Sequence, residues 1–249
     1  MRKILAYPIS IVHYLLLITI LSVFHILQVI AFNLFGYNAH KRVVDALNFC
    51  FAYNVLSLLC PVSFYEFKNI PKNRPLIIVS NHQSMYDISP IGWALRKHHP
   101  KFISKKELGK NLPSVSYNLH KGGSVLIDRG SGSQSIKEIL KLGKKMEEKN
   151  WSVCLFPEGT RSKTGELKAF QAAGFKTLLK ASPSALIVPF VIDGNYKLHK
   201  WGSFPLNIGI RLKYSVLEPM KREDYSSDEE LLEEVRNKIQ LHLNNGRKI

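Results

Sequence analysis

The charge-free segment that follows Lys3 constrains the fold of this chain more than any other feature. None of positions 4–40 is Asp, Glu, Lys or Arg, and Ile9–Phe35 is dense in Ile, Leu, Val and Phe. About 20 such residues are enough to cross a bilayer as a helix. A cleaved signal peptide fits poorly, because its apolar stretch would be only ~7–15 residues long and would end in a small-residue cleavage site. The segment therefore predicts an apolar helical membrane anchor at the N-terminus.

A second apolar segment, Val43–Val62, follows at once and carries one acidic residue, Asp45, near its start. The two segments fit either a helical hairpin that lies in one leaflet or a single span followed by an interfacial helix. His13, His25 and Gln28 dilute the first segment. We favour the hairpin over a true span.

The segment Asn81–Asp87, NHQSMYD, lies directly behind Pro75–Ser80, an apolar run typical of a short buried β-strand. His82 and Asp87 are five positions apart and cannot meet on a continuous helix, where neighbours lie three or four positions apart. A strand that ends at His82 and a helix that begins near Ser84 would bring the two side chains together. The carboxylate would then hold one ring nitrogen, and the other nitrogen would accept a proton from a substrate.

The same segment has a simpler interpretation. Ser84 and Asp87 fit a capping box, in which the carboxylate only satisfies a free backbone N–H at the start of a helix. An HxxxxD pattern alone does not distinguish a catalytic pair from a capping box. Three further blocks favour catalysis, and each lies in or just after a strand-like run: Gly123–Arg129, Phe156–Ser162 and Val188–Phe190.

In order and rough spacing, the four blocks resemble the motifs NHxxxxD, GxxxIDR, FPEGTRS and VPF of the glycerolipid acyltransferases. This family contains the 1-acylglycerol-3-phosphate (lysophosphatidic acid) acyltransferases. The blocks extend from about Pro75 to Pro189, and the FPEGTRS block is highly specific. The resemblance implies an enzyme that transfers a fatty acyl group to the sn-2 hydroxyl of lysophosphatidic acid and so makes phosphatidic acid for phospholipid biosynthesis.

The residues fit that chemistry. Acyl transfer from a thioester to a hydroxyl needs a base for the hydroxyl and donors for the tetrahedral oxyanion, but no protein nucleophile. No Ser has Gly at both −2 and +2, so the nucleophile elbow is missing. We therefore expect His82 to deprotonate the acceptor and Asp87 to orient His82 as the catalytic pair. Backbone N–H groups at the helix start, together with Lys105, are expected to face the oxyanion.

The expected substrate-binding residues are Lys105, Arg129, Glu158, Gly159, Thr160 and Arg161. Arginine presents a planar fork that suits phosphate oxygens, and glycine lets the backbone approach closely. In the family, the residues that match Glu158, Gly159 and Arg161 help to bind the phosphorylated acceptor, and the match to Arg129 is also implicated. Glu158 could instead be a structural partner of Arg161, and the sequence does not separate these roles.

No metal and no cofactor is expected, since Cys50, Cys60 and Cys154 form no CxxC or His/Cys pattern and have the apolar surroundings of inert core thiols. The acyl donor is expected to be acyl-CoA or acyl-carrier protein. The net charge of +16 comes with no nucleic-acid signature, and a basic surface attracts anionic lipid and an anionic donor. The expected partners are therefore a lysophospholipid acceptor, the donor and membrane lipids, without nucleic acid, at the cytoplasmic face of the inner (plasma) membrane.

Three other functions remain open on the sequence. They are acyl transfer to another acceptor (glycerol-3-phosphate or another lysolipid), hydrolysis by a membrane-bound esterase, and lipid binding by a catalytically silent membrane protein. The Asn-His-Gln-Ser form of the first block resembles lysophosphatidate enzymes more than glycerol-3-phosphate enzymes. The missing nucleophile elbow weighs against the esterase, and the intact His82 and Asp87 weigh against the silent protein.

Beyond the anchor, apolar runs alternate with segments of helical spacing, which predicts an α/β fold with a mixed β-sheet covered by helices. We expect residues 1–62 to form the anchor and residues 63–249 to form the acyltransferase domain. The expected strands are Ser63–Phe67, Leu76–Ser80, Lys101–Ser104, Ser124–Ile127, Val153–Phe156, Ala185–Ile192 and Ile208–Val216, and the expected helices are Ser135–Lys149, Lys168–Ala181 and Asp228–Asn244. The apolar stripe of the last helix is expected to face the core.

Overall fold

The computed structural model describes residues 1–65, 70–110, 112–128 and 130–246. Within them the strands form one sheet, in the order β1-β7-β6-β2-β5-β3-β4. The strands are β1 (Val62–Tyr65), β2 (Leu76–Ser80), β3 (Pro100–Lys105), β4 (Val125–Ile127), β5 (Ser152–Leu155), β6 (Leu186–Asp193) and β7 (Leu212–Val216). β6, β2, β5, β3 and β4 run parallel to one another, β7 is antiparallel to β6, and β1 is parallel to β7. The expected mixed sheet is confirmed.

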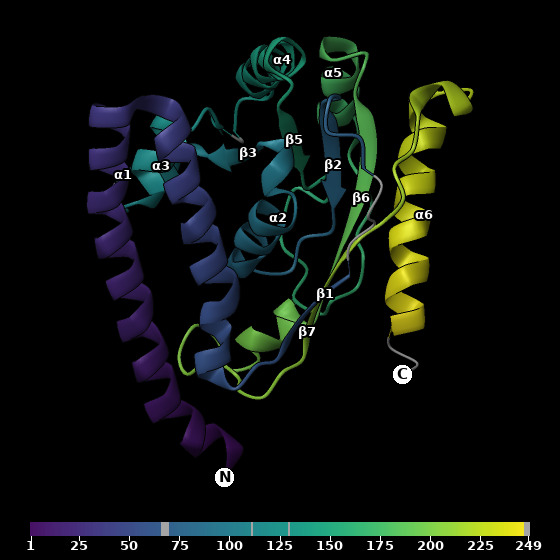
Figure 1. The fold of residues 1–249 in the computed structure, drawn as a ribbon. Coiled ribbons are helices and arrows are strands. Elements are labelled where there is room, and N and C mark those ends of the chain that lie inside the picture. The colour runs from purple at the N-terminus through teal and green to yellow at the C-terminus, as the bar shows by residue number, and fades with distance from the viewer. Residues whose placement is uncertain (66–69, 111, 129, 247–249) are drawn as a thin grey trace.

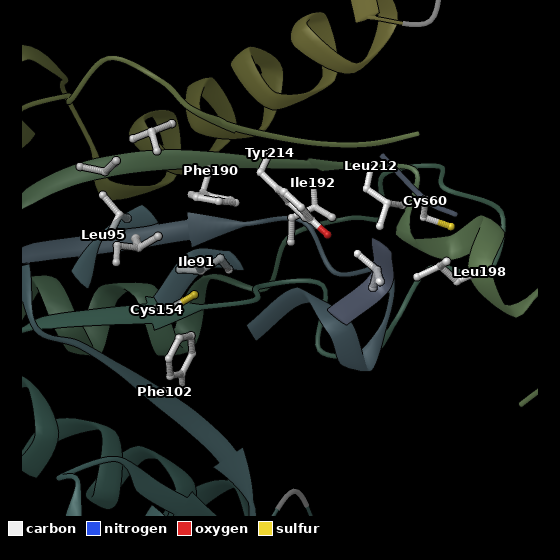
Figure 2. Close-up of a cluster of buried hydrophobic side chains, with 14 of the residues drawn as sticks. Cys60, Ile91, Leu95, Phe102, Cys154, Phe190, Ile192, Leu198, Leu212 and Tyr214 are labelled. Atoms are coloured by element: carbon white, nitrogen blue, oxygen red, sulfur yellow. The ribbon is translucent and has the colours of Figure 1, made fainter. Parts of the chain in front are cut away.

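Helices cover both faces of this sheet (Figure 1). They are α1 (Arg2–Asn54), α2 (Ile88–Ala94), α3 (Val115–Lys121), α4 (Gly132–Lys149), α5 (Ala172–Ala181) and α6 (Asp228–Gly246), with 3₁₀ turns η1 (Val55–Leu58), η2 (Met85–Asp87), η3 (Arg96–His98), η4 (Lys106–Gly109), η5 (Asn195–His199) and η6 (Arg222–Asp224). Along β2, Leu76 and Ile78 enter the core cluster beside α1 and α2, whereas Ile77 and Val79 enter the cluster under α4, α5 and α6. Ile91, Phe190 and Tyr214 are among the members of the first cluster that Figure 2 labels. Because both faces are buried, residues 76–79 of β2 are all apolar, as is typical of central parallel strands, and the strand ends with the polar Ser80.

Helix α1 is broken at Gly36, where φ is 76° and ψ is −167°. A residue without a Cβ adopts this conformation readily, and the chain reverses there into two limbs that run side by side (Figure 1). Polar contacts join the limbs: His40 Nε2 lies 3.3 Å from Gln28 Oε1, and Asn54 Nδ2 lies 3.3 Å from His13 Nδ1. The N-terminal segment is therefore a helical hairpin.

The hairpin packs along the α/β body. Ala6, Val55 and Leu58 belong to the core cluster on the α2 side of the sheet. His13 and Gln28, two of the polar residues that dilute the apolar segment, are fully buried against this body. The expected boundary at residues 62 and 63 falls at the start of β1, and the core of the hairpin is continuous with that of the sheet.

Several expected elements differ from those observed, each for a local reason. Helix α5 begins at Ala172 rather than Lys168, because the N–H of Lys168 donates to Glu158 and the N–H of Gln171 to Pro157. Strand β7 begins at Leu212, since the N–H of Gly209 donates instead to the carbonyl of Leu58, away from the sheet. Helix α3 was not expected, and the expected strand Ser63–Phe67 runs partly outside the described residues. The stripe on α6 is buried as expected, at Leu231, Leu232, Val235, Ile239 and Leu243.

Candidate active site

Three of the four sequence blocks lie at one edge of the sheet. β2, β5, β3 and β4 are parallel, so their carboxyl ends lie at the same edge. The segments that follow them carry His82, Phe156–Arg161 and Asp128, and β3 ends at Lys105. In open α/β sheets, ligands bind at the carboxyl edge of the strands. Segments far apart in sequence are thus brought together where a ligand is expected.

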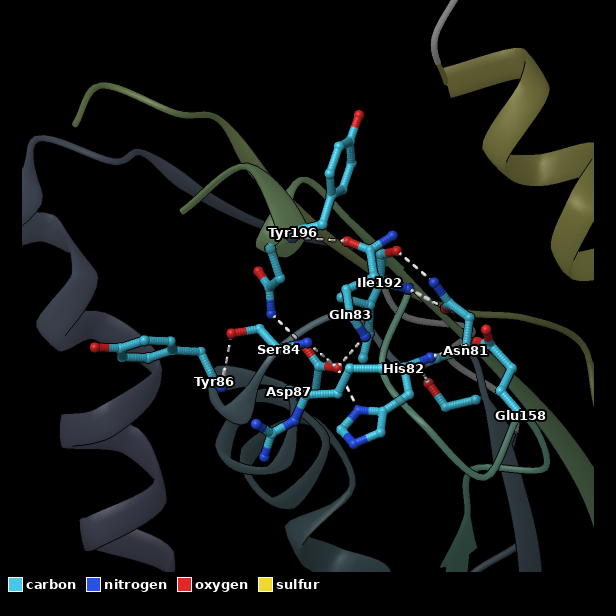
Figure 3. A network of polar contacts seen from close by, with 12 residues as sticks. Asn81, His82, Gln83, Ser84, Tyr86, Asp87, Glu158, Ile192 and Tyr196 are labelled. Carbon is cyan, nitrogen blue, oxygen red and sulfur yellow. Dashed lines mark hydrogen bonds and ion pairs between the residues drawn. The ribbon is translucent and has the colours of Figure 1, made fainter. Parts of the chain in front are cut away.

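His82 and Asp87 meet across a tight turn, as the spacing predicted. β2 ends at Ser80, η2 begins at Met85, and His82 Nδ1 lies 2.7 Å from Asp87 Oδ2 (Figure 3). A carboxylate only accepts hydrogen bonds, so the shared proton is on Nδ1. Within the described part of the chain, Nε2 of His82 makes no hydrogen bond. The Nε2 lone pair is therefore available to accept a proton.

Asp87 also caps the start of η2, so the two interpretations of this segment are both correct. Its Oδ2 accepts hydrogen bonds from the N–H groups of Gln83 at 2.6 Å and Ser84 at 2.9 Å. The Ser84 hydroxyl in turn accepts from the N–H of Tyr86 at 3.3 Å. Asp87 is fully buried, and the cap fixes its carboxylate opposite the imidazole.

The expectation that backbone N–H groups at the helix start face an oxyanion is wrong for three residues. The N–H groups of Gln83 and Ser84 donate to Asp87, and that of Tyr86 donates to the Ser84 hydroxyl. These donors stabilise the carboxylate and its cap, and they are not available to a substrate oxygen.

The loop after β5 holds the backbone of His82 from both sides. Glu158 Oε1 accepts from the N–H of His82 at 2.7 Å, and the N–H of Ser162 donates to the carbonyl of His82 at 2.7 Å. The Phe156 ring stacks on the imidazole, with centroids 4.2 Å apart and planes 21° apart. The FPEGTRS block therefore fixes the position and the ring plane of His82.

Glu158 is occupied by backbone groups rather than by Arg161. Its second oxygen, Oε2, accepts from the N–H of Lys168 at 3.2 Å, and the residue is 5% exposed. Burial raises the pKa of the Glu158 carboxyl, although the N–H donors of His82 and Lys168 oppose this. Both carboxylate oxygens thus support the loop, and the expected contact of Glu158 with substrate stays a prediction.

The other expected substrate-binding residues lie around this loop. Gly159 has a φ of 68°, which suits a glycine, and Thr160 Oγ1 accepts from Lys168 Nζ at 2.9 Å. Arg161 is exposed and lines a cavity beside η2. Lys105 is exposed at the end of β3. Arg129 lies outside the described residues.

The cavity, of about 300 Å³, lies between α1, α2, α3 and β3. Met85, Tyr86 and Arg161 line it beside the His82–Asp87 pair, and Phe51, Phe102 and Leu119 are among its apolar lining residues. Lys41, Asp45 and Lys101 also line it. Burial, with Lys41 nearby, lowers the pKa of Lys101 to about 7, and the ammonium donates to the Tyr37 hydroxyl at 2.6 Å. The cavity is thus apolar for much of its wall and carries buried charge in one part.

A family model described as Acyltransferase matches residues 61–193, more than half of the chain. The chain belongs to the acyltransferase family. The relatives include three proteins named 1-acyl-sn-glycerol-3-phosphate acyltransferase. That of Cocos nucifera is 31% identical over 157 residues (63% of this chain, 49% of that protein), the human beta form 33% over 124 (50% and 43%), and that of Helicobacter pylori 38% over 119 (45% and 48%). The resemblance seen in the four blocks is confirmed.

The fold of this acyltransferase also matches a solved structure. The crystal structure of the 1-acyl-sn-glycerophosphate acyltransferase PlsC from Thermotoga maritima has a TM-score of 0.80, with 24% identity over 99% of this chain and 98% of that one. This likeness establishes the α/β fold with its N-terminal helices. The acyltransferase spans about half the length of the curated relatives it matches.

Several residues that support the acyltransferase site were not expected. Asn195, in η5, donates from Nδ2 to Asp87 Oδ1 at 2.7 Å, and the Tyr214 hydroxyl donates to Asn195 Oδ1 at 2.9 Å. Asn81 bridges β2 to β6 by two hydrogen bonds of 2.8 Å with the backbone of Ile192 (Figure 3). Asn81 was within the first block, whereas no local pattern marks Asn195 or Tyr214.

The described residues contain no group of three or more His, Cys, Asp or Glu arranged to hold a metal ion. Cys154, in β5, is buried, and this burial raises the pKa of its thiol well above the ordinary value. A thiol in this state is a poor nucleophile. Cys154 is therefore unsuited to act as a nucleophile at this edge.

Proposed function

We propose that this acyltransferase moves a fatty acyl group from acyl-CoA or an acyl-carrier protein to the sn-2 hydroxyl of lysophosphatidic acid, giving phosphatidic acid. The observation that carries the proposal is the His82–Asp87 pair, 2.7 Å apart, with Nε2 of His82 unbonded within the described residues at the carboxyl edge of the sheet. The names of these relatives, each a 1-acyl-sn-glycerol-3-phosphate acyltransferase, support the acceptor.

In the proposed reaction the acceptor oxygen attacks the thioester carbonyl while its proton passes to Nε2 of His82. The tetrahedral intermediate then collapses, the C–S bond breaks, and the leaving thiolate takes the proton from Nε2 of His82. Asp87 stabilises the imidazolium that forms between these steps, because its carboxylate faces Nδ1 in a fully buried position. A general base of this kind contributes ~10²–10⁴ in rate.

The acceptor phosphate is proposed to bind Arg161, with Lys105 at the end of β3 and Arg129, which lies outside the described residues, as further cations. Arg161 is exposed and lines the cavity beside Met85 and Tyr86. A guanidinium holds phosphate oxygens with two parallel hydrogen bonds. This arrangement would direct the lysolipid hydroxyl towards His82 and leave the apolar part of the cavity wall for an acyl chain.

The membrane is proposed to contact the outer face of the hairpin. Among the described residues, Arg2–Leu58, which Gly36 divides into the two limbs of the hairpin, is the helical segment long and apolar enough to cross a membrane by length and composition, and only 11% of its most apolar part is buried. Ile11, Leu15 and Ile18 are more than half exposed, whereas the polar His13 and Gln28 face inward. A soluble protein seldom exposes so large an apolar face. We therefore assign residues 1–62 as the anchor of the domain formed by residues 63–249, on the cytoplasmic side.

The proposal is tested with purified full-length protein in mixed micelles. Radiolabelled acyl-CoA and acyl-carrier protein donors are each offered with lysophosphatidic acid, glycerol-3-phosphate, a zwitterionic lysophospholipid, or water alone. The expected result is label in phosphatidic acid, with turnover on lysophosphatidic acid at least tenfold above the other acceptors. Release of free fatty acid as the main product would indicate an esterase, and no product with any acceptor would indicate a silent lipid-binding protein.

A further inference from the structure

The Asp87 carboxylate divides its hydrogen bonds unevenly between its two oxygens. Oδ2 accepts from His82 Nδ1, from the N–H of Gln83 and from the N–H of Ser84. Oδ1 accepts from one group within the described residues, the side-chain amide of Asn195 at 2.7 Å. All of this lies in a site from which water is excluded, since Asp87 and Asn195 are both 0% exposed. Among the described residues, Oδ1 therefore relies on a single side chain for its hydrogen bond.

The orientation of the Asn195 amide is itself fixed. An ionised carboxylate accepts but does not donate, so the NH₂ group must face Asp87 and the carbonyl must face away. The Tyr214 hydroxyl donates to that carbonyl oxygen, Oδ1, at 2.9 Å, and Tyr214 is 1% exposed in the core cluster. Tyr214 thus holds the amide in the one orientation that donates to Asp87.

The backbone delivers Asn195 from a neighbouring strand. β6 pairs with β2 on one side and with β7 on the other, and Asn195 follows the end of β6 through Gly194. Gly194 has a φ of 100°, and a Cβ there would lie 2.4 Å from the carbonyl oxygen of Arg211. Only glycine therefore allows the turn. The path of hydrogen bonds from Tyr214 through Asn195 and Asp87 to His82 thus joins β7, β6 and β2.

We infer that Asn195 is a positioning residue for the acyl transfer, which keeps the Asp87 carboxylate aimed at His82, and that Tyr214 acts through Asn195. This inference rests on the proposed role of His82 as the base. Without the amide, the buried Oδ1 would have no donor among the described residues, and the carboxylate would rotate away from the imidazole. In that orientation it no longer supports the imidazolium.

The test compares Asn195→Leu, Tyr214→Phe and the double variant in full-length protein. Leucine has the same number and branching of side-chain heavy atoms as asparagine but no donor, and phenylalanine keeps the ring of Tyr214. With lysophosphatidic acid and acyl-CoA, Asn195→Leu should lower kcat about ten- to hundredfold, the scale of one lost charge-assisted hydrogen bond. The KM values for both substrates should stay within about threefold, because neither residue is proposed to touch substrate.

Tyr214→Phe should lower kcat less, by about three- to tenfold, because the Asn195 amide loses the hydrogen bond that fixes its orientation but keeps its donor group. In the Asn195→Leu background the same change should have no further effect on kcat, because Tyr214 acts through the amide. If the losses of kcat in the two single variants were equal and added up in the double variant, the coupling of Tyr214 through Asn195 would be rejected.

The matched control is Asn207→Leu, since Asn207 is also buried and bonds the backbone of Lys197 and Ile208, without contact to Asp87. It should change thermal stability but leave kcat per folded molecule near that of wild type. Unchanged kcat in Asn195→Leu, with wild type active, would overturn the inference. An inactive wild type would instead overturn the proposed function. If Asn195→Leu does not fold, the kcat of Tyr214→Phe decides alone.

Discussion

The backbone N–H of His82 donates to the carboxylate of Glu158, 76 residues further along the chain, over 2.7 Å. The side chain of the third block thereby holds the main chain of the first, and the histidine is positioned by its backbone as well as by Asp87. A carboxylate is well suited to this role, because its two oxygens accept two backbone donors without needing a proton.

Glu158→Gln should reduce kcat about five- to hundredfold and lower the stability by about 1–3 kcal/mol, because the amide can accept from only one of the two N–H groups and leaves the other buried and unpaired. Steady-state kinetics and thermal unfolding measure the two effects. Glu166→Gln, on the exposed part of the same loop, is the control. A rise in KM for the acceptor alone, with kcat unchanged, would return Glu158 to substrate binding.

His82→Ala should abolish transfer while membrane association and fold stay near normal, because it removes the proposed base. Asp87→Asn should also lower turnover strongly, and it should cost stability, because the carboxylate caps η2. Single-turnover assays and circular dichroism provide the measurements. Retention of more than about a tenth of wild-type turnover in both variants would reject the base, given the ~10²–10⁴ expected.

Arg161→Ala should raise the KM for lysophosphatidic acid by about ten- to a hundredfold, the scale of a charge-assisted phosphate contact, and change the KM for acyl-CoA much less. Lys163→Ala, an exposed cation on the same loop, should change neither. Initial rates with lysophosphatidic acid and with its phosphate-free monoacylglycerol analogue separate the contributions. Equal increases for donor and acceptor would assign Arg161 to the donor or to folding.

The buried Lys101 should make stability depend on pH. Its pKa is lowered from 10.5 to about 7 by burial, so between those values the unfolded chain binds more protons than the folded one, and stability rises with pH. Lys101→Met should remove up to about 3 kcal/mol of the rise between pH 6.5 and pH 9.5. Thermal unfolding in detergent at both pH values measures this, with the exposed Lys97→Met as control. An unaltered pH dependence would show that Lys101 keeps an ordinary proton affinity.

The hairpin is best tested on its outer face, because deletion of residues 1–60 would also remove Ala6, Val55 and Leu58 from the core. A triple change of Ile11, Leu15 and Ile18 to Gln should weaken binding to anionic vesicles at least tenfold, since each apolar side chain contributes about 1.5–3 kcal/mol on burial. Flotation of vesicles measures binding. Leu241→Gln, an exposed apolar change on α6, should have no effect. Recovery of wild-type protein in the soluble fraction after a carbonate wash would reject an embedded hairpin.

The sequence predicted those features that depend on neighbours in the chain. β2 was expected at Leu76–Ser80 and lies there, because a strand buried on both faces carries a continuous apolar run, here residues 76–79. The contact between His82 and Asp87 was expected because a strand that ends near His82, followed by a helix that begins near Ser84, brings residues five positions apart together. Both signals are local.

What could not be predicted depends on contacts between distant segments. Asn195 reaches Asp87 across 108 positions, and an asparagine after a glycine is common in any turn. The backbone role of Glu158 leaves no pattern, since a main-chain N–H has no residue identity. The inward direction of His13 is set by its bond to Tyr86, at 2.8 Å, and the hydropathy of α1 alone contains no such information.

The inner face of α1 has a consequence for protein engineering. His25 accepts from the N–H of Ser114, Ser10 accepts from the N–H of Leu206, and His13 bonds the Tyr86 hydroxyl. A chimera that carried an unrelated transmembrane helix in place of this hairpin would leave each of these groups without its partner. The hairpin is therefore not an interchangeable tether, and transplanting the catalytic region onto another anchor requires these three polar positions to be transplanted with it.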